Sequence, residues 1–301
     1  MSQVIAQLDH FLEELARQGK PTTTIRAYRF DLVSFGRYFA TTTGEPFRVE
    51  AITPTDVRDY KAHLLTVEGR KPATINRHLA SLKSFCGWAL AEGLISELPT
   101  DRVKGVQGGS AGPKWLEKRE VHRLLRAVER SGIKRDLAIV STLYHTGLRV
   151  QELCQLRLAD VELSERKGSL IVRAGKGGKY RVIPLNADVR TAIGDYLAVR
   201  PKALDDQLFL SQRLKGLKPR MVEYLAGNHA RLAGLEGVTP HTLRHSFCKH
   251  ALDAGVNLVE VSKLAGHRRL ETTAIYTTPS YQDLEKSVSR LERDHVAISR
   301  P

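Results

Sequence analysis

A glycine-rich stretch at residues 105–113 limits the folds open to this chain more than any other feature. The stretch, GVQGGSAGP, contains four glycines and a proline and almost no large apolar side chain. This composition is typical of a linker, because glycine and proline interrupt regular structure and little in the stretch can anchor a core. The parts before and after it are each long enough to bury a core of their own. The sequence therefore predicts two domains, residues 1–104 and 114–301.

The first domain is predicted to be a bundle of four helices. Apolar residues recur at helical spacing in four segments, and no strand pattern separates them. The third segment, TPTDVRDYKAHLL, opens with a capping threonine and has Pro54 in its first turn. The apolar stripes of the other three segments are Val4, Ile5, Leu8, Leu12 and Leu15; Ile25, Tyr28, Leu32, Phe35 and Phe39; and Ile75, Leu79, Leu82, Cys86 and Ala89.

The second domain is predicted to be mostly helical, with one small element of β-structure. In SLIVRAGKGGKYRVIPL, residues 170–173 and 180–185 are typical of two strands that form a hairpin around GKGGK. The segments with helical patterns are 118–131, 135–146, 150–157, 186–199, 219–233, 241–254, 257–265 and 281–293. The expected fold class is therefore mainly α with a small β-sheet.

The charge of the chain indicates a polyanionic partner, most simply nucleic acid. The formal net charge is +14 and the pI is near 9.8. Residues 1–107 contain 14 Lys and Arg against 12 Asp and Glu, whereas the remainder contains 33 against 21. Because the basic excess is concentrated in the second domain, it is not explained by solubility alone.

Other classes of protein are disfavoured by the sequence. No stretch approaches the length of a membrane span, and the N-terminal segment is amphipathic and acidic, unlike a secretion signal. Cys86, Cys154 and Cys248 are far apart and show neither metal-ligand nor redox spacing, which predicts reduced core residues in a cytoplasmic protein. The stretch AGKGGK lacks the spacing of a nucleotide phosphate loop. Neither a cofactor nor a metal is expected.

Four places in the second domain carry side chains suited to chemistry. Arg149 opens a helix in TGLRVQELCQL, and Lys176 lies at the tip of the hairpin. In TPHTLRHSFCKH, His241 and Arg244 are three residues apart on one face of a helix, where an arginine and the helix start suit a phosphate. In LAGHRRLETTAIYTT, His267 follows a helix-ending glycine and Tyr276 lies nine residues further on.

This set of residues suits phosphoryl transfer without a metal. Arginines neutralise charge that develops on the phosphorus, a tyrosine can attack it, and a histidine or lysine can protonate the leaving oxygen. Arg149, Lys176, His241, Arg244, His267 and Tyr276, in this order, resemble the tyrosine recombinase (phage integrase) family. The motifs TGLRVQEL, GKGGKYRVIPL, HTLRHSF and LAGHRRLETTAIYT carry the resemblance, which covers nearly the whole chain and is greatest to the Xer-like members.

The resemblance implies a site-specific recombinase that cleaves and rejoins DNA through a 3′-phosphotyrosyl intermediate and a Holliday junction. Residues 1–104 would be a core-binding domain and residues 114–301 a catalytic domain, which together form a C-shaped clamp on duplex DNA. The six residues would be catalytic, with Tyr276 as nucleophile and Lys176 as general acid. Partners would be paired inverted-repeat half-sites, further protomers as a dimer on each site and a tetramer in the synapse, and a second recombinase or accessory protein. Residues 281–293 would dock on a neighbouring protomer.

Several alternatives stay open. Tyr281 is a rival nucleophile and Lys179 a rival lysine. His241 and His245 suggest zinc only weakly, because no third ligand lies nearby in the sequence, and His245 is expected to be a structural hydrogen-bonding residue. His250 and His295 are expected at the surface, and Arg77 and Lys83 either reach a DNA groove or are merely solvated. The alternative functions are type IB topoisomerase-like DNA relaxation by a single protomer and a DNA-binding regulator without catalysis.

Overall fold

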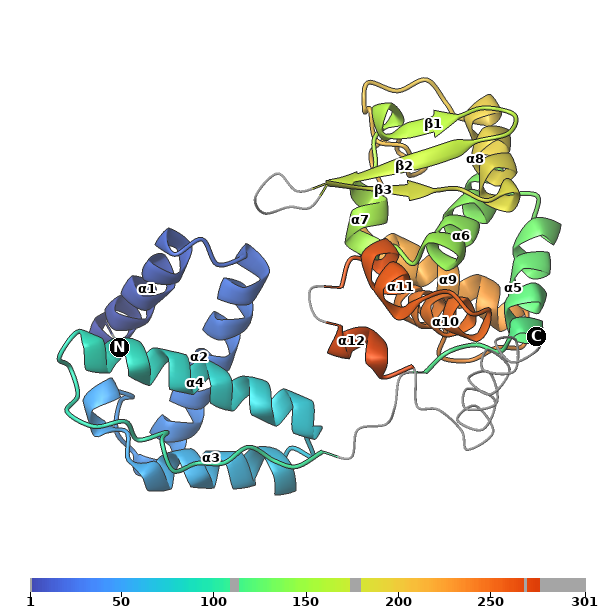
Figure 1. Cartoon of the computed structure of the whole chain (residues 1–301). Helices are drawn as coiled ribbons and strands as arrows, with labels where there is room; N and C mark the ends of the chain where they lie inside the picture. Colours follow the sequence, from blue (N-terminus) through green and yellow to red (C-terminus); the bar gives the residue numbers. More distant parts are fainter. Residues whose placement is uncertain (1, 109–113, 174–179, 268–269, 277–301) are drawn as a thin grey trace, which may run out of the picture. The chain divides into compact units, whose positions relative to one another are not determined.

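The computed structural model describes residues 2–108, 114–173, 180–267 and 270–276 (Figure 1). The chain divides into two compact units, residues 1–110 and 111–301. Within the described ranges, no helix is both long enough and apolar enough to cross a membrane. The predicted helix at 281–293, the rival residues Lys179 and Tyr281, and His295 lie outside the described residues.

The first unit contains the four predicted helices. They are α1 (Ser2–Arg17), α2 (Thr22–Thr43), α3 (Pro54–Thr66) and α4 (Pro72–Ala91), with a short 3₁₀ helix at Val49–Ala51. The start of α3 shows why the sequence signal was clear. The Thr53 hydroxyl accepts a hydrogen bond from the Asp56 amide (3.2 Å), and the Asp56 carboxylate accepts one from the Thr53 amide (2.8 Å). This reciprocal cap, with Pro54 in the first turn, fixes where α3 begins.

The core of the first unit is rich in aromatic rings. The described part of the predicted stripe on α1 is buried, as are Leu32, Phe35 and Phe39 on α2. Phe11, Phe85 and Tyr60 are also almost fully buried, and Phe11 and Phe85 meet edge to face with ring centroids 5.3 Å apart. Phe11, Tyr60 and Phe85 come from α1, α3 and α4, and α2 packs on all three of these helices (Figure 1). The aromatic side chains therefore form one core shared by the four helices.

Arg77 is not a free cation on the surface of α4. Its Nη1 atom donates to both carboxylate oxygens of Asp31 on α2, at 2.5 and 2.6 Å. Asp31 is 1% exposed and also accepts a hydrogen bond from the Ser81 hydroxyl (2.7 Å). A buried carboxylate must be paired, so Arg77 has a structural role that the sequence did not indicate. Lys83 is exposed.

The beginning of the predicted linker is attached to the first unit. The Val106 amide donates to Asn76 Oδ1 (2.8 Å), and Asn76 Nδ2 donates to the Val106 carbonyl (3.0 Å). These paired bonds hold residues 105–108 against α4.

The second unit is mainly helical with a small antiparallel sheet, which confirms the predicted fold class. Its helices are α5 (Lys118–Arg130), α6 (Lys134–Thr146), α7 (Val150–Gln155), α8 (Ala187–Val199), α9 (Pro219–Leu232), α10 (Pro240–Asp253), α11 (Leu258–Ala265) and α12 (Glu271–Ala274), with a 3₁₀ helix at Leu158–Asp160. The strands are β1 (Val161–Leu163), β2 (Gly168–Arg173) and β3 (Tyr180–Pro184), in the order β1-β2-β3.

The predicted pairing of residues 170–173 with residues 180–185 is confirmed, and the sheet also contains a third strand, β1, that the sequence did not predict. β2 pairs with β3 in a register that sets Arg173 opposite Tyr180, and β1 pairs with β2 on the other edge. With three residues, β1 is too short to show an alternating pattern, which explains why the sequence did not predict it. Lys176 falls between Arg173 and Tyr180 in the sequence and is outside the described residues.

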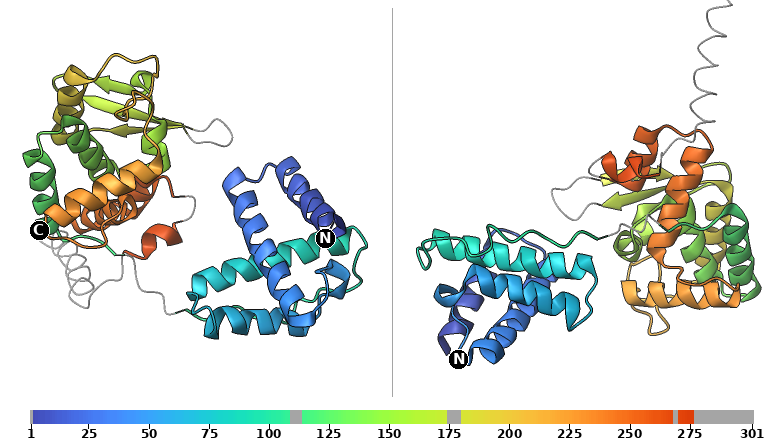
Figure 2. Two further views of the ribbon diagram at one scale, coloured as in Figure 1. Left: turned by 180° about the vertical axis from the view of Figure 1, so that it is seen from behind. Right: turned by 90° about the horizontal axis from the view of Figure 1, so that it is seen from below.

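The core of the second unit extends from the sheet to α6. Leu170, Val172 and Ile183 of the sheet are buried together with Ile139 and Leu143 of α6. α8 lies beside the sheet in Figure 1 and in the view from behind in Figure 2. α10 packs on α6 and on α11, and α11 contacts α12. Helices α6, α10, α11 and α12 therefore form one continuous packed group.

Candidate active site

Arg149 lies at the start of α7, as predicted, and its side chain turns toward the end of α11. Gly147 closes α6 in a left-handed conformation (φ 63°), and Arg149 is the residue before the first turn of α7. Its Nη2 atom donates to the Gly266 carbonyl (2.8 Å), and its Nη1 atom donates to Glu152 (3.1 Å). The Arg149 side chain is 45% exposed. The guanidinium is thus held at one edge and open to solvent.

Arg244 reaches the same place from α10. It is 3% exposed, and its Nη1 atom donates to the Ala265 carbonyl (2.7 Å) and to the Gly147 carbonyl. Its Nη2 atom is buried and has no hydrogen-bond partner among the described residues. The two arginines therefore meet at consecutive carbonyls, those of Ala265 and Gly266.

Arg181 and Glu152 hold Arg149 and the end of α11 in place beside the carbonyls of Ala265 and Gly266. Neither residue was predicted from the sequence as part of the site. Arg181, on β3, donates to the two carboxylate oxygens of Glu152 (3.0 and 2.8 Å) and to the Leu264 carbonyl (3.0 Å). Burial would raise the pKa of Glu152, but hydrogen bonds from Arg181 and Arg149 outweigh it and lower that pKa. Glu152 is therefore an anion that connects both arginines. The only available signal was their presence within the motifs TGLRVQEL and KYRVIPL.

Gly266 ends α11 as predicted, and its lack of a side chain matters for Arg181. Its φ is +69°, a left-handed conformation that favours glycine. A Cβ atom at this position would lie 2.7 Å from Arg181 Nη1. Glycine thus allows the turn that exposes the 265 and 266 carbonyls and also leaves room for the supporting arginine.

Two histidines on α10 continue the site from Arg244. Pro240 begins the helix, and the Thr239 hydroxyl accepts a hydrogen bond from the Thr242 amide (3.1 Å). His241 is exposed, and its ring lies 4.1 Å from the ring of His245 one turn further along. His245 Nδ1 is hydrogen-bonded to the Tyr276 hydroxyl. His245, expected only to be structural, thus connects His241 with the predicted nucleophile.

His267 and Tyr276 lie on either side of α12. His267 Nδ1 shares a hydrogen bond with the Thr273 hydroxyl (2.6 Å). Tyr276 is 6% exposed and packs with Cys248, Val261 and Ala265. The phenol is therefore buried in this structure and does not project into solvent, and its hydroxyl is hydrogen-bonded to His245.

The site is strongly cationic. Burial, and then the charge of Arg149, lowers the pKa of Arg244 to about 10, which leaves it protonated at neutral pH. Burial, followed by Arg244 and Arg149, lowers the pKa of His267 to about 4 and also lowers that of His241. Burial, and then the neighbouring Cys248, raises the pKa of Tyr276. Neutral histidines and two close guanidiniums favour the arrival of an anion.

The structure brings together five of the six predicted residues: Arg149, His241, Arg244, His267 and Tyr276. The sixth, Lys176, lies outside the described residues. One expectation is wrong: His250 is buried, with Nδ1 at 3.0 Å from the Tyr144 hydroxyl. It lies on α10 one turn beyond Ser246, on the side that packs against α6, and a lone histidine in the sequence did not indicate that side.

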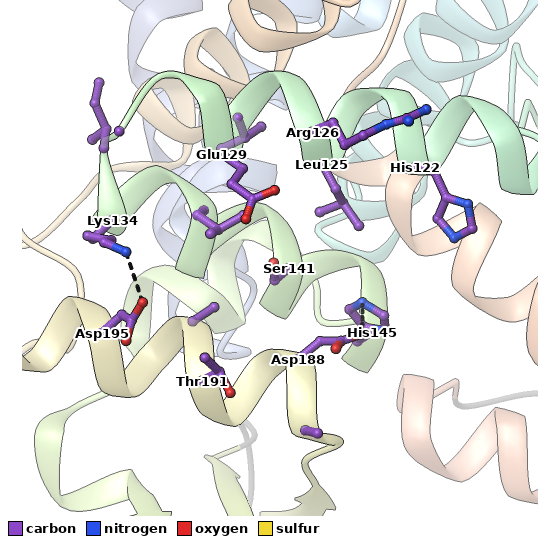
Figure 3. Close-up of a pocket in the computed structure, with 16 residues that line it drawn as sticks. His122, Leu125, Arg126, Glu129, Lys134, Ser141, His145, Asp188, Thr191 and Asp195 are labelled. Atoms are coloured by element: carbon purple, nitrogen blue, oxygen red, sulfur yellow. Dashed lines mark hydrogen bonds and ion pairs between the residues drawn. The ribbon is translucent and has the colours of Figure 1, made fainter.

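The rest of the described structure contains a pocket but no cluster of metal-ligating side chains. Within the described ranges, no group of three or more His, Cys, Asp or Glu residues is placed to hold a metal ion. A pocket of about 630 Å³ lies among α5, α6 and α8, where Lys134 and Asp195 form an ion pair (2.9 Å) (Figure 3). None of the six predicted residues is among those that line it.

Two family models match the chain along most of its length. The phage integrase family matches residues 114–283, and the phage integrase N-terminal SAM-like domain matches residues 8–93. The chain therefore belongs to the phage integrase family.

Relatives and solved structures agree with this assignment. The chain is 33% identical over 300 residues to tyrosine recombinase XerC of Thermodesulfovibrio yellowstonii, covering 96% of this chain and 95% of that protein. It is 36% identical to tyrosine recombinase XerA of Pyrococcus furiosus, covering 94% and 93%. A crystal structure of XerH recombinase bound to a palindromic difH substrate matches the fold with a TM-score of 0.76 and 23% identity, over 93% of this chain and 84% of that one. The chain is an Xer-like tyrosine recombinase, an enzyme that transfers DNA strands in site-specific recombination.

Proposed function

We propose that the second unit is the catalytic domain and that Tyr276 attacks a DNA phosphodiester to form a 3′-phosphotyrosyl bond. The P–O bond to the 5′-oxygen breaks, and that oxygen leaves as a hydroxyl. A strand from a partner duplex then attacks the phosphotyrosine, and two rounds of exchange pass through a Holliday junction. The single observation that carries the proposal is the convergence of Arg149 and Arg244 on the carbonyls of Gly266 and Ala265, beside His267.

Arg149 and Arg244 hold the non-bridging phosphate oxygens. The buried Nη2 of Arg244 supports this role, because an unpartnered buried donor is costly and a phosphate oxygen would satisfy it. Two close guanidiniums also repel each other, and an anion between them relieves that repulsion. Donors already in place for the charge of a pentacoordinate phosphorus lower the barrier without reorganisation.

The remaining residues move protons or orient the phosphate. Lys176 is the general acid that protonates the 5′-oxygen, His241 assists proton transfer from its exposed position on α10, and His267 donates a hydrogen bond to the phosphate. The Thr273 hydroxyl engages Nδ1 of His267 and so orients its ring. The arginines, the lysine and the histidines supply cationic and donor groups, so the proposed reaction takes no metal ion or nucleotide.

The partner is double-stranded DNA with paired inverted-repeat half-sites. The first unit is the core-binding domain, residues 105–113 join it to the catalytic unit, and the protein acts in the cytoplasm. Two protomers occupy each site and four form the synapse, and residues 281–293 dock on a neighbouring protomer. A second recombinase or an accessory protein is a further partner. The net charge of +14, concentrated after residue 107, supports binding to a polyanion.

The experiment is covalent trapping on a nicked duplex that carries the site selected by the protein from a randomised DNA pool. Wild-type protein is expected to yield a protein–DNA adduct, both with and without EDTA, and Tyr276→Phe is expected to yield none. Tyr281→Phe is the matched control and should retain the adduct. Relaxation of plasmids that lack the site, by a single protomer, would instead indicate a topoisomerase. Binding without any adduct would indicate a regulator.

A further inference from the structure

The hydroxyl of Tyr276 has a definite partner inside the protein. His245 Nδ1 is hydrogen-bonded to it, and the two ring centroids lie 5.5 Å apart. His245 is partly buried on α10, directly after Arg244 in the chain. A histidine next to a phosphate-binding arginine and in contact with a nucleophile is placed for more than packing.

We propose that His245 is a catalytic residue, the base that accepts the phenolic proton of Tyr276 during strand cleavage. The inference rests on the proposed function, because it takes Tyr276 as the nucleophile. As the bond between the tyrosine oxygen and phosphorus forms, the O–H proton passes to Nδ1 of His245 and the bond between phosphorus and the 5′-oxygen breaks. In strand rejoining, the same proton returns to the tyrosine oxygen, so the full reaction consumes no proton at His245.

The other histidines of the site are less well placed for this step. His267 uses Nδ1 for Thr273, and His241 touches the ring of His245 from the exposed side. His245 thus lies between the tyrosine and the exposed His241. Among the described residues, the charged and titratable groups that interact with it are His241 and Arg244 on its own helix, His267 before α12 and Tyr276 after it.

The charge of the site links this base to substrate binding. Burial, and then His241 and Arg244, lowers the pKa of His245 to about 4, so the ring is neutral and its Nδ1 lone pair is free to accept a proton at neutral pH. A phosphodiester between the arginines offsets the charge of Arg244 and therefore raises that pKa toward the range of an effective base. His245 thus becomes a stronger base when DNA is bound.

The test separates attack by the tyrosine from departure of the 5′-oxygen. Single-turnover cleavage is measured on the selected site with either an ordinary phosphodiester or a 5′-bridging phosphorothiolate, whose sulfur leaves without a general acid. The test variant is His245→Asn, because the asparagine oxygen can occupy the place of Nδ1 and accept a hydrogen bond but not a proton. His250→Asn is the matched control, since it makes the same change on the same helix at another histidine that pairs with a tyrosine hydroxyl.

His245→Asn is expected to cleave both substrates at least about 10²-fold more slowly than wild type, the lower end of the contribution typical of a general base. Lys176→Ala should be slow on the phosphodiester and recover on the phosphorothiolate. On the phosphorothiolate, the wild-type rate should fall as the pH drops through the pKa of His245, and this fall should disappear in the variant. His245→Gln serves as a second variant if thermal unfolding shows that His245→Asn is misfolded.

Two results would overturn the inference and leave the proposed function intact. One is wild-type cleavage of both substrates by His245→Asn or His245→Gln. The other is a defect that the phosphorothiolate corrects, which would assign His245 to the leaving group. By contrast, an adduct that persists in Tyr276→Phe would remove the proposed function itself.

Discussion

Substitution of Gly266 by alanine tests how the arginine cluster is held together. The new Cβ would lie 2.7 Å from Nη1 and 2.8 Å from Cζ of Arg181, so the guanidinium that donates to Glu152 must shift. The substitution also places alanine in a left-handed conformation, at φ +69°. Two separate costs therefore act at one position.

The matched control is Gly255→Ala. Gly255 also has a positive φ, +87°, but a Cβ there would meet nothing within 4 Å. The left-handed conformation alone costs about 1–2 kcal/mol, and the loss of one charge-assisted hydrogen bond of Arg181 costs about 1.5–3 kcal/mol. Gly255→Ala is thus expected to lower the free energy of unfolding by about 1–2 kcal/mol, and Gly266→Ala by roughly 2.5–5 kcal/mol.

The assay combines urea unfolding with single-turnover cleavage. Because Arg181 supports the Glu152 contact of Arg149, Gly266→Ala should also slow cleavage about tenfold or more, as expected for a loss of about 1.4 kcal/mol in the transition state. In an Arg181→Ala background the clash is absent, so Gly266→Ala should then cost no more than Gly255→Ala does. Equal effects of the two glycine substitutions in the wild-type background would refute the role assigned to Arg181.

Three further outcomes are expected. Thr273→Val removes the hydroxyl that pairs with His267 Nδ1 and should lower the cleavage rate about tenfold with little change in DNA affinity by gel shift; an unchanged rate would remove Thr273 from the site. Asp31→Asn should destabilise the protein by about 1–3 kcal/mol in urea unfolding, because Arg77, Ser81 and His78 lose a buried anion. The control Asp9→Asn breaks an exposed ion pair with Arg29 and should change the free energy of unfolding by less than about 0.5 kcal/mol. Equal effects of the two substitutions would contradict the structural role of Asp31. The pKa values of His245 and His267 lie near 4 in the folded protein, below the ordinary 6.5. Between pH 4 and 6.5 the unfolded chain therefore binds more protons than the folded protein, so the free energy of unfolding should fall as the pH drops from 6.5 to 4. A midpoint temperature of unfolding that does not decrease over that range would argue against buried neutral histidines.

Local signals in the sequence predicted most of the fold. Helix starts such as Thr53 and Pro54 and helix ends such as Gly266 are decided by a few neighbouring residues, which a single sequence displays. The short strand β1 has no such signal, because its three residues are defined by pairing with β2. Phe11 and Phe85 lie outside the predicted stripes but complete the core, since the helices bury wide faces.

The site was predictable as a set of residues but not as a network. Arg149, His241, Arg244, His267 and Tyr276 stood out because their types and order resemble a known family. The contacts that hold them join distant positions: the bond from Arg149 to the Gly266 carbonyl spans 117 residues, and those from Arg181 to Glu152 and between His245 and Tyr276 span 29 and 31. Such contacts depend on tertiary packing, and so does the burial of His250 and the ion pair of Arg77 with Asp31.

The most direct measurement for the central claim is the location of the covalent bond to DNA. Tandem mass spectrometry of the trapped adduct, after digestion of protein and DNA, identifies the modified side chain within residues 270–286, which contain both Tyr276 and Tyr281. We predict a nucleotide joined through its 3′-phosphate to Tyr276. A nucleotide on Tyr281 or on any other residue, or one joined through a 5′-phosphate, would contradict it.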